Sequence, residues 1–164
     1  MNPPTVAEAL PTVVMFAVGN ESRGDDALGP RLARAVEQAA PAGVRVVGDF
    51  QLQIEHALDI DGADLVLFVD AAQRQDAALR FVEIAPVDGR AAFSHALAPA
   101  AVLGVYRQLR GTPPPAFVLG VAGENFELGA PLSGAAQAAE TAAQAFLARL
   151  LGTPQVTAWR SLCG

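Results

Sequence analysis

The sequence predicts an α/β fold, a three-layer α/β/α sandwich around a largely parallel, five-stranded twisted sheet. Short β-branched and aliphatic runs alternate along the chain with segments of helical periodicity. The most apolar run, LVLFV at 65–69, shows no polar alternation, which is typical of a central strand covered on both faces. Right-handed crossovers would then bring the ends of the first, third and fifth strands to one edge, where we expect the functional site.

Composition limits the class of protein. The 164 residues are 52% hydrophobic and 17% charged, which suits one domain with a sizeable core. A net charge of -6 argues against a nucleic-acid partner. The single cysteine, Cys163, allows no intramolecular disulfide and favours a reducing compartment. Without a secretory signal or an apolar run of about 20 residues, we expect a cytoplasmic monomer with no membrane partner.

The chain divides into three parts. Residues 1–11 contain three prolines and are expected to form a loose leader. Residues 12–152 form the single domain. Gly152, Thr153 and Pro154 stop the last helix, so we expect residues 153–164 to be a C-terminal tail.

The first strand, turn and helix are the most informative stretch. An apolar run at 13–18 ends at Gly19, and a polar turn then leads to the adjacent acids Asp25 and Asp26. Pro30 is tolerated only in a first turn, so the helix begins close to Asp26. Its apolar stripe is formed by Leu28, Leu32, Ala35, Val36 and Ala39.

The remaining elements follow from the same patterns. We expect strands at 44–47, 65–69, 79–84 and 117–121, and helices at 52–58, 99–110 and 134–151. The mixed polarity of 79–84 suits an edge strand. Pro99 is a suitable first helical residue, and Ser133 is expected to cap the last helix.

Three side chains with metal-ligand chemistry follow predicted strands or lie in loops: Asp26, Asp70 and His95. Each has an ordinary explanation alone, as a helix-dipole acid, a turn cap and a loop histidine. Together at one sheet edge, two carboxylates and an imidazole would suit zinc or nickel and leave coordination positions open. Asp25 is expected to be a helix cap or a support for this site, and His56 a surface helix residue.

Other chemistries find less support. Gly19 and Gly24 lie before a helix, as in phosphate-binding turns, so a nucleotide- or small-ligand-binding module is an alternative. However, neither GK[ST] nor GxGxxG is present, and two carboxylates would repel a phosphate. No serine lies in a GxSxG elbow, and Cys163 is given no role. Glu124 and Glu127 are placed in a solvated loop that could line a cleft.

The segment AVGNESRGDDALGPRLARAVE at 17–37 resembles the N-terminal signature of the hydrogenase maturation endopeptidases. The matching residues are Gly19, Asn20, Asp25, Asp26 and Gly29, and Ala17 stands at the usual first glycine. The resemblance continues through LVLFVDA, FSHALAPAAVL and GENFELGAPLS, and spans residues 13–150. The stretch FQLQIEHALDI replaces the more usual GGT-type segment, which suggests a different client subgroup.

The resemblance implies a peptidase that removes the C-terminal extension of a nickel-loaded [NiFe] hydrogenase large-subunit precursor. Asp26, Asp70 and His95 would be its catalytic and metal-contacting residues. The nickel would be carried by the client and signal its readiness, and zinc or cadmium could substitute for it. A non-catalytic assembly factor for the same client is the other alternative.

Overall fold

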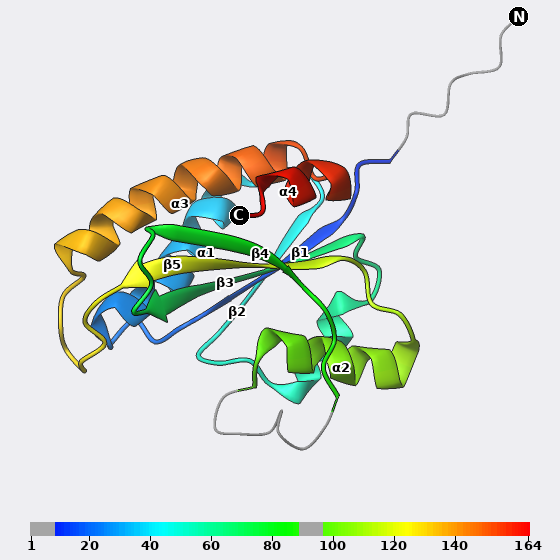
Figure 1. The fold of residues 1–164 in the computed structure, drawn as a ribbon, viewed down its shortest axis with the longest axis horizontal. Coiled ribbons are helices and arrows are strands. Elements are labelled where there is room, and N and C mark those ends of the chain that lie inside the picture. The colour runs from blue at the N-terminus through cyan, green and yellow to red at the C-terminus, as the bar shows by residue number, and fades with distance from the viewer. Residues whose placement is uncertain (1–8, 89–96) are drawn as a thin grey trace, which may run out of the picture.

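The computed structural model, which describes residues 9–88 and 97–164, is an α/β/α sandwich with a five-stranded sheet (Figure 1). The strands are β1 (Val13–Val18), β2 (Val44–Asp49), β3 (Leu65–Gln73), β4 (Leu79–Ile84) and β5 (Ala116–Gly123). The helices are α1 (Leu28–Ala39), α2 (Pro99–Arg110), α3 (Gly134–Gly152) and α4 (Val156–Leu162), with two 3-10 helices, η1 (Gly24–Ala27) and η2 (Ile54–Ile60). No helix in these ranges is long and apolar enough to cross a membrane.

The strand order β2-β1-β3-β5-β4 confirms the largely parallel sheet. β1 pairs in parallel with β2 and β3, and β3 with β5, whereas β4 runs antiparallel to β5 at the edge. Residues 74–78, between β3 and β4, are too few to form a crossover helix, so the chain returns in the opposite direction. The edge position expected for 79–84 is confirmed, and the carboxyl ends of the four parallel strands share one edge.

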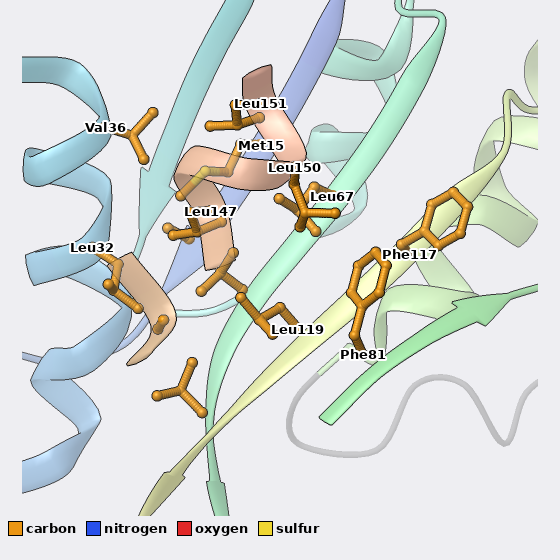
Figure 2. Packing of buried hydrophobic residues seen from close by; sticks show 14 of the residues in the cluster. Met15, Leu32, Val36, Leu67, Phe81, Phe117, Leu119, Leu147, Leu150 and Leu151 are labelled. Atoms are coloured by element: carbon orange, nitrogen blue, oxygen red, sulfur yellow. The ribbon is translucent and has the colours of Figure 1, made fainter. Parts of the chain in front are cut away.

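Both faces of the sheet are covered, which explains the continuous apolar runs of β1 and β3. On one face, strand residues such as Met15, Leu67 and Leu119 pack against Leu147 and Leu150 of α3 (Figure 2). On the other face a second cluster joins β1 and β3 to α2 and η2; its buried members include Phe16, Ala57, Ile60, Phe68, Val102 and Leu103.

The prediction of a C-terminal tail at 153–164 is wrong. Residues Val156–Leu162 form α4, which lies beside α3 in Figure 1, and Trp159 is fully buried. The Trp159 indole Nε1 donates to the Leu150 carbonyl oxygen at 3.0 Å, and its ring packs edge-on against Phe81 and Phe117. Because these aromatic rings on β4 and β5 pack against the indole, α4 belongs to the core.

Candidate functional site

The register of the sheet places Asp70 beside the end of β1. Val69 is the partner of Ala17, and Asp70 itself is the partner of Gly120 in β5. The strand continues to Gln73, so Asp70 lies within β3 rather than just after a strand ending at Val69. Side chains alternate between faces, so Asp70 shares the face of Phe68, which α2 and η2 cover.

The carboxylate of Asp70 is electrostatically unusual. Desolvation raises its pKa to about 7, the negative charge of Asp26 acts in the same direction, and a hydrogen bond from the Ala71 amide opposes both. The residue nevertheless keeps one side exposed to solvent. An approaching cation can therefore reach a carboxyl group that is only partly ionised near neutral pH.

Asp26 reaches this edge because η1 packs directly on the end of β1. A Cβ at Gly19 would lie 2.0 Å from the Asp26 carbonyl oxygen, and one at Gly29 would lie 2.1 Å from the Val18 carbonyl oxygen. Only glycine allows such close approach of two backbones. The half-buried Asp26 accepts a hydrogen bond at Oδ2 from the Asn20 amide at 2.7 Å. The helix η1 also contacts β3, and the charge of Asp26 raises the pKa of Asp70.

His95, the third predicted ligand, lies outside the described residues. Within residues 9–88 and 97–164, no group of three or more histidine, cysteine or acidic side chains is arranged to hold a metal ion. The donor set that these ranges do contain, Asp26 and Asp70, fits a divalent cation in its chemistry. Two carboxylates that repel one another supply oxygen ligands and negative charge, and they leave further coordination positions open.

Asp25 points away from this pair and is fully buried. Its carboxylate accepts hydrogen bonds from the amides of Glu124, Asn125 and Ser133 and from the Ser133 hydroxyl, at 2.7 to 3.0 Å. Burial opposes ionisation, but the bonds from Ser133, Glu124 and Asn125 outweigh it and lower the pKa of Asp25. The helix-cap role predicted for Asp25 is wrong, because neither η1 nor α1 has a side-chain cap and the Asp25 carboxylate is bound to the segment before α3.

The edge contains a further acid–histidine pair that the sequence reasoning missed. His56, expected on the surface, is only 8% exposed. Its Nδ1 accepts from the Gln53 amide at 2.8 Å, so Nε2 carries the proton and faces Asp49 Oδ2 at 3.3 Å. Asp49 ends β2, much as Asp70 follows the apolar run of β3. This position after a strand is the sequence feature that could have identified Asp49 as a residue of the edge. Glu124 and Glu127 are exposed, as expected of a solvated loop.

Fold and edge together define an α/β/α protein with two acids, Asp26 and Asp70, at the carboxyl ends of its parallel strands. No known protein family matches the sequence, and no curated protein resembles it in sequence.

Solved structures do resemble it. A [NiFe] hydrogenase maturation protease, HycI, from Thermococcus kodakarensis is 23% identical with a TM-score of 0.65, over 87% of this chain and 93% of that one. The hydrogenase maturating endopeptidase HybD from E. coli is 22% identical with a TM-score of 0.66, over 86% and 92%. A hydrogenase 2 maturation peptidase from a Thaumarchaeota archaeon is 20% identical with a TM-score of 0.62, over 86% and 98%. The chain thus has the fold of these proteases.

Proposed function

We propose that this protein is an endopeptidase that removes the C-terminal extension of a nickel-loaded [NiFe] hydrogenase large-subunit precursor. The observation that carries the proposal is the packing of η1, which bears Asp26, on β1 and β3 at the carboxyl edge of the sheet, where the charge of Asp26 raises the pKa of Asp70. These two acids come from two separate segments that carry the sequence resemblance. The shared fold with hydrogenase maturation proteases supports the same activity.

Asp26, Asp70 and His95 would contact the nickel of the client, which is part of the substrate. Asp70, with a pKa of about 7, must lose its proton before it binds a cation, and the approaching positive charge favours that loss. A bound divalent ion can polarise the scissile carbonyl, and a carboxylate that is not coordinated can act as the base toward water. Zinc or cadmium would be able to occupy the same ligands. We further propose that the protein acts as a cytoplasmic monomer.

The nucleotide-binding alternative is disfavoured by the first turn. Its amide groups are already engaged: Asn20 donates to Asp26 Oδ2, Asp25 to the Asn125 carbonyl and Asp26 to the Arg23 carbonyl. A phosphate site at a helix N-terminus requires free amides, and neighbouring carboxylates must be absent because they would repel the phosphate. This turn therefore uses its donors to hold its own acids.

The direct test is cleavage of purified nickel-loaded precursor, together with analysis of the client in a strain that lacks this protein. We expect unprocessed client in that strain and rescue by the wild-type gene. His95→Ala should retain residual activity, because water can replace one nitrogen ligand. Normal client processing in the deletion strain would reject the proposal. Binding of the precursor without cleavage would favour a non-catalytic assembly factor.

A further inference from the structure

Asp25 and Ser133, with the backbone amides of Glu124 and Asn125, form what we term the clasp. It joins the β1–α1 loop to the β5–α3 loop. Ser133 donates from its amide to Asp25 Oδ1 at 2.7 Å and from its hydroxyl to Oδ2 at 2.7 Å. Glu124 and Asn125 donate from their amides to Oδ2 at 2.7 and 3.0 Å. Both carboxylate oxygens are therefore occupied by donors.

Backbone contacts lock the same two loops together. The Asp25 amide donates to the Asn125 carbonyl at 2.8 Å, and the Gly129 amide to the Ser22 carbonyl at 2.7 Å. A Cβ at Gly24 would lie 2.3 Å from the Asn125 carbonyl oxygen. Gly24 has φ 53°, a left-handed conformation that favours glycine. The two loops thus meet without spare room, and neither can shift without breaking several hydrogen bonds.

The direction of Asp25 determines the direction of Asp26. Both residues lie in η1, where successive side chains project about 120° apart. Asp25 points inward to the clasp, whereas Asp26 accepts a hydrogen bond from the Asn20 amide and its charge acts on Asp70. A rotation of η1 that released Asp25 would also carry the Asp26 carboxylate away from Asp70.

We infer that Asp25 is a positioning residue for the acidic pair, and that the β5–α3 loop acts through it. By holding η1 in one orientation, the clasp sets the Asp26 carboxylate against Asp70 and so sets the affinity of this edge for a divalent cation. The consequence for precursor cleavage rests on the proposed function, whereas the consequence for cation binding needs only the acidic pair.

The test compares four variants at a temperature where each is folded. Both oxygens of Asp25 accept hydrogen bonds. In Asp25→Asn an NH2 group replaces one of these oxygens, so it faces an N–H or O–H donor and cannot accept the hydrogen bond. Ser133→Ala removes one clasp bond, and Ser133→Thr keeps the hydroxyl as the conservative replacement. Val36→Ala is the stability control: Val36 lies in α1 within the α1–α3 core, away from the clasp.

Three measurements separate positioning from simple destabilisation: Cd²⁺ binding to the isolated protein by calorimetry, kcat and KM for precursor cleavage, and amide exchange. We expect Asp25→Asn to weaken Cd²⁺ binding and lower kcat by about 10- to 100-fold, with the client KM unchanged. Ser133→Ala should cause a smaller loss that Ser133→Thr restores. The Glu124, Asn125 and Gly129 amides should exchange faster in Asp25→Asn than in Val36→Ala. Val36→Ala should leave Cd²⁺ binding, kcat and KM unchanged.

The outcomes distinguish the two proposals. Wild-type protein that binds Cd²⁺ but cleaves no precursor would remove the proposed function, and weaker binding by Asp25→Asn would still support positioning. Equal Cd²⁺ affinity and equal kcat in wild type and folded Asp25→Asn would overturn the positioning role and leave the endopeptidase proposal intact. A matching loss of kcat in Val36→Ala would also overturn it, because the effect would then follow stability alone.

Discussion

The clasp around Asp25 and the open pair of Asp26 and Asp70 lie next to each other, yet their carboxylates have opposite properties. Asp25 is fully buried and has a lowered pKa, because four donors stabilise its charge. Asp70 is open to solvent on one side and has a raised pKa, because the backbone hydrogen bond from Ala71 does not offset desolvation and the charge of Asp26. Hydrogen-bond donors, rather than exposure, therefore decide which acid is readily ionised.

Under the proposed function, this difference separates a structural acid, Asp25, from an acid that binds the cation, Asp70. The clasp satisfies the Asp25 carboxylate completely and leaves it no capacity for a ligand. Asp26 and Asp70 accept backbone hydrogen bonds from Asn20 and Ala71, but the donor to Asp70 does not offset desolvation and the charge of Asp26, so a cation could supply the missing positive charge. A carboxyl group with a perturbed pKa is typical of a functional site, and one fully engaged by donors is typical of a structural element.

The largest expected effect is the loss of cleavage when the open pair is altered. Asp26→Asn and Asp70→Asn each remove a negative charge that the cation needs, so precursor cleavage should fall about 100-fold or more. Thermal unfolding should show equal or higher stability, because the repulsion between the two acids is relieved. Wild-type cleavage rates in either variant, or inactivity explained by unfolding, would contradict the assignment.

Asp25→Asn should have the opposite effect on stability. Loss of charge-assisted hydrogen bonds at a buried carboxylate should lower the free energy of unfolding by about 2 to 4 kcal/mol, measured by urea titration. Asp26→Asn is the matched control, since it makes the same chemical change one residue away. If Asp26→Asn lowers the free energy of unfolding as much as Asp25→Asn does, the distinction between the clasp and the open pair is wrong.

Divalent cations should stabilise the protein through the open pair. At a Cd²⁺ or Zn²⁺ concentration 100 times the Kd, we expect a gain of about 2.7 kcal/mol and a corresponding rise in Tm. ATP, NAD and FMN should give no shift, and Asp70→Asn should abolish the response to the metals. Stabilisation by a nucleotide and by none of the metals would favour the nucleotide-binding module over the endopeptidase.

The smallest expected effect is a difference in pH dependence. Asp70 has a folded-state pKa of about 7 against an ordinary value of 3.8, so its contribution to stability is fully present below 3.8 and is lost as pH rises through about 7. The pKa of Asp25 is lowered from 3.8, so its contribution is present above that value and is lost as pH falls.

Urea titrations of wild type, Asp70→Asn and Asp25→Asn between acidic and neutral pH would measure how each acid makes the free energy of unfolding depend on pH. Wild type should lose stability relative to Asp70→Asn as pH rises toward neutrality. The difference in the free energy of unfolding between wild type and Asp25→Asn should instead become smaller at acidic pH. Parallel curves for wild type and either variant would show that the acid concerned is not shifted as described.

Much of the fold was predictable from local sequence. Buried strands need continuous apolar runs and amphipathic helices need a helical period, so 13–18, 65–69 and 99–110 were recognisable from their own residues. The edge bearing Asp26 and Asp70 followed as well, because parallel strands with right-handed crossovers place their carboxyl ends together. Sequence alone therefore determined the architecture and the location of the acidic pair.

Tertiary structure decided which acids are satisfied and what completes the core. The donors to Asp25 come from Glu124, Asn125 and Ser133, far along the chain, and no local pattern specifies that contact. Trp159 likewise becomes core only because α3 ends where β4 and β5 expose aromatic rings. Local sequence encodes whether a residue can be buried, but the partners that satisfy its charge or cover its surface are assembled only when distant segments pack together.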